Sequence, residues 1–233
     1  MSGIVLQGVG VRLGDTEVLR DVTLSSDART IAVIGENGSG KSTLGRLLSG
    51  LVAATAGTVR VLGLDPVRQA AELRRRVAVV FSNPDAQIIM PTVAEDVAFS
   101  LRTEKLSRAE RAERVDAALE RFDLADLAAR SSHDLSGGQK QLLALCGAFV
   151  RRPHLVVADE PTAYLDARNA RRVADHLFAD AAHADPSHRL VLVTHDLGLA
   201  QRCDTAVLVQ DGTVADVGDP AQVIATYEAG IRW

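Results

Sequence analysis

Short apolar runs recur along this chain, and they predict buried strands. The runs are Ile31–Ile34, Val77–Phe81 and Leu155–Ala158, and a further strand is expected at Arg189–Thr194. Continuous apolar runs without alternation are typical of parallel strands that are covered on both faces. Helical segments separate the runs, so the pattern predicts an α/β fold.

Other strands are expected outside these runs, at Ile4–Leu13, Val18–Leu24, Thr58–Leu62, Thr205–Gln210 and Thr213–Val217. The first two are joined by a predicted turn at Gly14-Asp15, which makes them antiparallel. The last two form a predicted hairpin, because Asp211-Gly212 strongly favours a type I′ turn.

The segment from Ser82 to about Leu135 has a different character, because Asn83-Pro84 breaks the strand pattern and helices follow. Ser107 is a predicted N-cap with Glu110 three residues on, a capping box. We interpret residues 82–135 as a helical subdomain inserted into a core of residues 1–81 and 136–233. The helices expected here are Val93–Leu101, Arg108–Phe122 and Leu124–Ala129. Those of the core are Ala70–Arg76, Gly138–Val150, Asp166–Asp180, Leu197–Arg202 and Pro220–Tyr227, with a loop at Ala181–His188.

A glycine-rich loop follows the first buried run and opens into a helix. It reads Gly35, Glu36, Asn37, Gly38, Ser39, Gly40, Lys41, Ser42, Thr43. It matches the full phosphate-loop pattern G-x-x-x-x-G-K-[ST] in its required strand–loop–helix context. Glycines allow backbone conformations that a β-carbon forbids, so the loop N–H groups can surround a phosphate at a helix N-terminus.

The loop side chains then have expected roles. Lys41 places a charge between the β- and γ-phosphates, the Ser42 hydroxyl is a magnesium ligand, and Thr43 is placed for the α-phosphate. The alternative is a glycine-rich connector with an incidental Lys-Ser.

An acidic pair, Asp159-Glu160, ends the run Leu155–Ala158. In a phosphate-loop enzyme the strand-end Asp holds magnesium together with Ser42. Glu160 can polarise the attacking water. Without the loop upstream, the pair reads equally well as a strand-to-loop exit.

A second predicted anion cradle lies at Leu135–Gln139, where Ser136, Gly137, Gly138 and Gln139 open a helix. One chain needs only one such cradle for its own nucleotide. We therefore expect the second to serve the nucleotide of a neighbouring chain. The alternative is the glycine-containing N-terminus of a structural helix.

The charge and composition of the chain limit the classes of partner that we expect. The 233 residues carry a net charge of −4 without a block of like charge, which argues against a nucleic-acid partner. No secretory signal and no apolar window of membrane-spanning length is present. Cys146 and Cys203 lack metal or redox spacing and are interpreted as reduced structural residues.

In this order, the phosphate loop, Leu135–Gln139, Leu155–Glu160 and Thr194-His195-Asp196 resemble the ATPase subunit of ABC transporters over essentially the whole chain. The resemblance implies a phosphate-loop NTPase core with an N-terminal antiparallel β-subdomain and an inserted α-helical subdomain. It implies ATP and Mg²⁺ as cofactors and a head-to-tail dimer that sandwiches two ATP molecules. His195 would contact the γ-phosphate, and Asp166 would couple the two sites.

Two positions depart from the family pattern. Ser82 stands where the family usually has a magnesium-binding Gln, and Gln87 lies five residues further on as a possible interface residue. Arg12 and Leu13 stand where an aromatic residue usually stacks on adenine. Arg12 can stack as a planar cation, and Leu13 can give apolar contact. We expect weaker base selectivity than in other members.

Asn83-Pro84-Asp85-Ala86-Gln87, followed by Thr92-Val93 and Asp96–Phe99, resembles the energy-coupling-factor branch, which imports vitamins and cobalt or nickel. The segment Ile89-Met90-Pro91 and the short end at Trp233 are most similar to the biotin-transporter ATPase. The implied partners are a transmembrane coupling subunit and a substrate-binding membrane subunit, at the cytoplasmic face of the membrane. A coupling helix would enter a groove near Ile88, Ile89, Met90 and Val97, which could equally be subdomain core.

Several alternatives stay open. The chain could be a soluble ABC-type ATPase acting on a non-transport complex, or a regulatory subunit with low turnover. It could pair with itself or with a paralogue. The sequence does not name the transported substrate.

Overall fold

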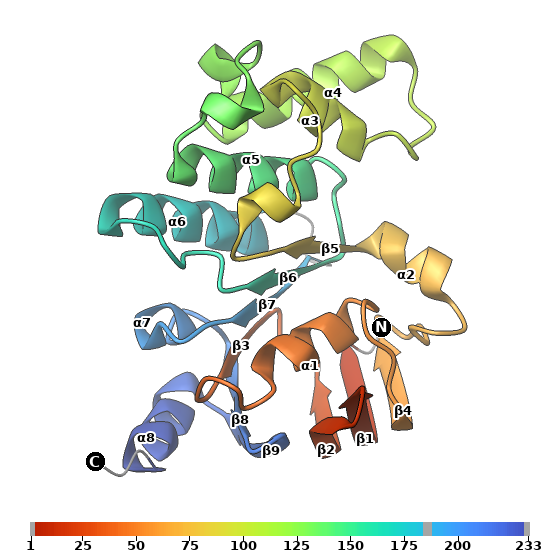
Figure 1. Ribbon diagram of the computed structural model, residues 1–233, viewed down its shortest axis with the longest axis vertical. Coiled ribbons are helices and arrows are strands. Elements are labelled where there is room, and N and C mark those ends of the chain that lie inside the picture. The colour runs from red at the N-terminus through yellow and green to blue at the C-terminus, as the bar shows by residue number, and fades with distance from the viewer. Residues whose placement is uncertain (1–2, 184–187, 231–233) are drawn as a thin grey trace. The chain divides into compact units, whose positions relative to one another are not determined.

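The computed structural model describes residues 3–183 and 188–230 (Figure 1). Part of the predicted loop at 181–188 and the chain end at Trp233 lie outside them. The chain forms two compact units. Unit 1 comprises Met1–Val77, His154–Glu160 and Ser187–Trp233, and unit 2 comprises Ala78–Pro153 and Pro161–Pro186. The predicted boundary of the helical subdomain at 82–135 stays a prediction.

Unit 1 contains two sheets. The antiparallel sheet has the order β2-β1-β4, from β1 (Ile4–Leu13), β2 (Thr16–Ser26) and β4 (Ala56–Val61). The other sheet contains the consecutive strands β6-β7-β3-β8-β9. They are β3 (Thr30–Ile34), β6 (Leu155–Asp159), β7 (Arg189–Val193), β8 (Thr205–Gln210) and β9 (Thr213–Gly218). Strands β6, β7, β3 and β8 are parallel, and β9 is antiparallel.

The buried apolar runs form the predicted strands because their residues are covered on both faces. Every residue of β3 and β6 is buried. The helix α1 (Lys41–Leu48) packs closely on the sheet. A β-carbon on its Gly45 would lie 3.1 Å from Val193 and 3.4 Å from Val157. This close packing of α1 against β6 and β7 fixes the position of the helix relative to these two strands.

The turn between β8 and β9 has the residues and backbone conformation that the sequence predicted. Asp211 and Gly212, with φ values of 49° and 78°, join β8 to β9 as the predicted type I′ turn requires. The other helices of unit 1 are α2 (Ala70–Arg76), α7 (Leu197–Ala200) and α8 (Pro220–Gly230).

Unit 2 is mainly helical, with α3 (Val93–Ser100), α4 (Arg108–Arg121), α5 (Gly137–Phe149) and α6 (Ala167–His183). Short 3₁₀ turns lie at η1 (Pro84–Ala86), η2 (Ala125–Leu127) and η3 (Ser132–Asp134). Strand β5 (Val77–Val80) contains the point where the chain leaves unit 1. Within unit 2, α5 lies between α6 and the pair α3 and α4, which explains why it is apolar on nearly all sides (Figure 1).

Two local predictions in unit 2 were wrong. The predicted helix at 124–129 is only the 3₁₀ turn η2, and the left-handed backbone of Asp123 (φ 56°) separates it from α4. The predicted loop begins too early, because α6 continues to His183 through two alanines, the residue with the highest helix propensity. Val97 is fully buried, so it belongs to the core of unit 2 and does not line a groove.

Cys146 and Cys203 are buried free thiols, as predicted. Burial raises the pKa of each thiol to about 12, so both are unreactive at neutral pH. Among the described residues, no helix combines the length and the apolar content that crossing a membrane requires.

The capping box at the start of α4 is confirmed and gives a stability prediction. The Glu110 backbone N–H donates to Ser107 Oγ at 3.2 Å, and the Glu110 carboxylate accepts from the Ser107 N–H at 2.7 Å. Ser107→Ala should lower the local stability of α4 by about 1 kcal/mol, measured by amide hydrogen exchange. Ser107→Asp keeps an N-cap oxygen and is the matched control. Equal protection in the alanine variant and the native chain would contradict the assignment.

Candidate functional site

The phosphate loop connects β3 to α1, and its glycines adopt conformations that other residues rarely take. Gly35, Gly38 and Gly40 have φ values of 143°, 82° and 106°. A β-carbon at Gly35 would lie 2.1 Å from the carbonyl oxygen of Val209 in β8, which is far inside van der Waals contact. The predicted need for glycine is confirmed, and at Gly35 it comes from close approach as well as from φ.

Lys41 is the first residue of α1 and is 6% exposed. Its Nζ donates to the backbone carbonyl of Glu36 at 2.6 Å, so the side chain folds back over the loop. Burial lowers the pKa of Lys41, while the nearby charges of Glu160 and Asp159 oppose that shift. An ammonium group among carboxylates is thus held next to the loop amides.

The Ser42 hydroxyl donates to Asp159 Oδ1 at 2.8 Å. Asp159 is the last residue of β6, so this bond joins the start of α1 to the end of a strand more than a hundred residues later. The sequence predicted that these two side chains act together, and the structure brings them together. Ser39 is 7% exposed, and its hydroxyl oxygen has no hydrogen-bond partner among the described residues.

Glu160 and His195 form a contact that the sequence did not predict. The Glu160 carboxylate and His195 Nδ1 are 2.8 Å apart. Glu160 has a left-handed backbone (φ 50°), and its N–H donates to the carbonyl of Val193 in β7. Because β6 and β7 are parallel neighbours with Asp159 opposite Val193, residues that follow the two strands meet at the same edge. Because Glu160 and His195 both follow the ends of predicted buried strands, the sequence contained a signal from which this contact could have been predicted.

The remaining predicted site residues of unit 1, Arg12 and Leu13, are the last two residues of β1. Arg12 donates to the carbonyl of Asp15 at 3.0 Å and is exposed, and Leu13 is 42% exposed. Both are accessible to a ligand, and their contact with adenine stays a prediction.

Ser136–Gln139 belongs to unit 2, where Ser136 is the N-cap of α5. Gln139 Oε1 accepts from the Ser136 N–H at 2.9 Å, and the Gln139 N–H donates to Ser136 Oγ at 3.4 Å, which makes a capping box. Gly137 and Gly138 are the first two residues of α5. Ser136 and Gly137 are exposed.

Three other predicted residues also lie in unit 2. Asp166 precedes α6 and accepts from the Asn169 N–H at 2.9 Å. Ser82 is half-buried. Gln87 donates to the Val79 carbonyl and accepts from the Phe81 N–H, both at 2.8 Å, so it holds the backbone just before Ser82.

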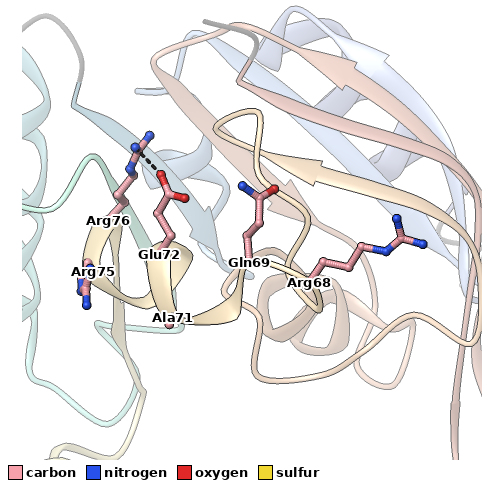
Figure 2. Close-up of a pocket in the computed structure, with 6 residues that line it drawn as sticks. All are labelled: Arg68, Gln69, Ala71, Glu72, Arg75 and Arg76. Atoms are coloured by element: carbon pink, nitrogen blue, oxygen red, sulfur yellow. Dashed lines mark hydrogen bonds and ion pairs between the residues drawn. The ribbon is translucent and has the colours of Figure 1, made fainter.

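A surface hollow next to α2 is separate from the phosphate loop. It is lined by Arg68, Gln69, Ala71, Glu72, Arg75 and Arg76 (Figure 2). Arg76 pairs with Glu72 at 2.6 Å, and Figure 2 shows Arg68 and Arg75 pointing away from each other. Their guanidinium groups do not converge on one anion.

A family model described as ABC transporter matches residues 19–163, well over half of the chain. The chain belongs to the ABC transporter family. The fold and the resemblance predicted from sequence are confirmed. As an ABC ATPase, the chain has ATP as its nucleotide.

Relatives cover nearly the whole of this ABC subunit. An ABC transporter ATP-binding protein of Deinococcus radiodurans is 43% identical over 99% of both chains. The energy-coupling factor transporter ATP-binding protein EcfA1 of Lactiplantibacillus plantarum is 38% identical over 94% of this chain and 78% of its own length. The biotin transport ATP-binding protein BioM of Rhizobium etli is 36% identical over 96% and 97%.

The solved structure of cbiO1 from Clostridium perfringens, titled as part of the ABC transporter complex cbiONQ, is also similar to this chain. It has a TM-score of 0.86 and 29% identity, and the match covers 98% of this chain and 92% of cbiO1.

Alanine substitutions at two glycines of the phosphate loop should destabilise the chain to different extents. Gly38→Ala meets open space, so only the left-handed backbone costs stability, about 1–2 kcal/mol. Gly35→Ala adds the clash with Val209, which should cost about 1–3 kcal/mol more. Urea unfolding of both variants measures the difference. Equal losses of unfolding free energy would show that close approach at Gly35 does not matter.

Proposed function

We propose that this chain binds and hydrolyses ATP between two copies of itself and thereby drives an energy-coupling-factor importer. The observation that carries the proposal is the grouping of side chains at one edge of the parallel sheet. Ser42 contacts Asp159, and Glu160 contacts His195, beside the loop that holds Lys41. This grouping supplies a cation, a hydroxyl and carboxylates around one phosphate position.

Glu160 is the proposed group that orients the attacking water for in-line displacement. Its contact with His195 fixes the direction of the carboxylate, since each partner restrains the other. His195, with a side chain that is 67% exposed, would also face the γ-phosphate. Lys41 and the loop amides would stabilise charge that develops on the transferred group.

Ser42 and Asp159 fit a magnesium ion. A hydroxyl and a carboxylate oxygen 2.8 Å apart are the oxygen ligands that Mg²⁺ prefers. No group of three or more His, Cys, Asp or Glu side chains suited to a metal lies within residues 3–183 and 188–230, which agrees with an ion held largely by phosphate and water. The bound ion would neutralise phosphate charge.

The second half of the site would come from another chain. Ser136 and Gly137 are exposed at the N-terminus of α5, where backbone donors favour an anion. The buried, unpartnered hydroxyl of Ser39 in the phosphate loop is a candidate hydrogen-bond group for the same nucleotide. ATP touching both chains would close the dimer, and hydrolysis would open it. Asp166 is the proposed coupling residue between the two sites.

The relatives support a place in a membrane importer. The names EcfA1 and BioM, and the cbiO1 title, belong to transporter subunits that this chain matches over nearly its whole length. We infer a transmembrane coupling subunit and a substrate-binding membrane subunit as partners, at the cytoplasmic face of the membrane. A vitamin is the proposed cargo, and biotin is favoured by the similarity to BioM.

Replacing Glu160 tests the function directly. Glu160→Gln keeps the size of the side chain but removes the charge that orients water, so phosphate release should fall at least about 100-fold. ATP binding should remain, and size-exclusion chromatography with light scattering should then show twice the mass of a single chain in MgATP.

Glu228→Gln is the matched control, because Glu228 is an exposed carboxylate on α8. It should hydrolyse ATP at the native rate. Normal turnover in Glu160→Gln would contradict the proposed role. A native chain that binds ATP without releasing phosphate would favour the regulatory alternative.

A further inference from the structure

Two segments of unit 2 that carry proposed dimer functions are packed against each other. Residues 136–138 begin α5, Asp166 immediately precedes α6, and these two helices are in contact (Figure 1). One side chain, that of Asn169 in the first turn of α6, contacts both segments.

Asn169 fills the space beside Gly138. A β-carbon at Gly138 would lie 2.5 Å from Asn169 Cγ, 2.6 Å from its Oδ1 and 3.0 Å from its Cβ. Nothing lies within 4 Å of the same position on Gly137. Gly138 has a helical backbone, so it is not required for a positive φ. It is required because the Asn169 amide lies where any other side chain would begin.

Moving the Asn169 amide aside would cost free energy, because the amide is hydrogen-bonded to Asp166. Asn169 Nδ2 donates to Asp166 Oδ2 at 2.6 Å, and the Asn169 backbone N–H donates to Oδ1 at 2.9 Å. Both carboxylate oxygens are therefore occupied by one residue. These bonds, first the backbone one and then the side-chain one, lower the pKa of Asp166 and keep it ionised. Hydrogen bonds to an ionised acceptor are stronger than neutral ones.

We propose that Asn169 is a positioning residue that holds Asp166 and residues 136–138 as one block, so that both reach the partner chain's nucleotide together. This inference rests on the proposed function, since it assigns a role within the same paired site. Asn169 belongs to unit 2, whereas the phosphate loop, Glu160 and His195 belong to unit 1. Its substitution should therefore change turnover and leave binding of ATP to a single chain intact.

Asn169→Ala is the first test. It removes the side-chain bond to Asp166, and the misplacement should lower ATP turnover by about tenfold. The dissociation constant of fluorescent ATP for the isolated chain should stay within about twofold, because the phosphate loop belongs to unit 1 and Asn169 to unit 2. Arg171→Ala, an exposed change on the same helix, is the matched control and should keep the native turnover.

A double-mutant cycle tests the contact itself. Gly138→Ala alone should reduce turnover more than Asn169→Ala, because its β-carbon meets the held amide. In Gly138→Ala/Asn169→Ala the amide atoms at 2.5 and 2.6 Å are gone and only the β-carbon of position 169, at 3.0 Å, remains, so turnover should recover most of the way to the level of Asn169→Ala. Residues in contact give such non-additive effects, whereas independent sites do not.

Three results would overturn the proposal. They are native turnover in Asn169→Ala, a double variant whose loss is the product of the two single losses, and an Asn169→Ala chain that loses ATP affinity and thermal stability together. Failure of the proposed function is distinguishable, because it would appear as absent phosphate release in the native chain before any variant is compared.

Discussion

The hydrogen bond between Ser42 and Asp159 is the interaction on which the site depends. It joins the phosphate loop after β3 to the end of β6, although β7 lies between these two strands in the sheet. At Gly35 the loop passes so close to β8 that no side chain fits. Parallel pairing then brings Glu160 and His195 to the same edge. The order of the strands in the sheet therefore determines which side chains meet at the site.

One buried lysine lies among the carboxylates at this edge of the sheet. Lys41 is buried among Asp159, Glu160 and the loop, and burial lowers its pKa. A charged group held in such a place has already lost much of its water, so it interacts strongly with a phosphate that arrives. The carboxylates that balance Lys41 in the described structure are those assigned to magnesium and to water. Nucleotide binding therefore exchanges one set of ionic contacts for another.

Local patterns in the sequence predicted much of the fold and the residues of the phosphate loop. Continuous apolar runs, the Asp211-Gly212 turn and the Ser107 capping box each depend on neighbours within a few residues. The Glu160–His195 contact and the approach of Asn169 to Gly138 do not. They join residues 35 and 31 positions apart, and no short-range signal records which strand or helix packs beside another. The helix predicted at 124–129 is only a 3₁₀ turn in the structure, directly after the left-handed Asp123.

The central claim is that one ATP is held by two copies of the chain, through the phosphate loop of one and the start of α5 of the other. Cysteines placed by Asn37→Cys, at an exposed position of the phosphate loop, and by Ser136→Cys test it, since Cys146 and Cys203 are buried and do not compete for the crosslinker. Mixing the two variants with MgATP should give a crosslinked pair, and omitting ATP should reduce it. The absence of any crosslink in chains that demonstrably bind ATP would contradict the account.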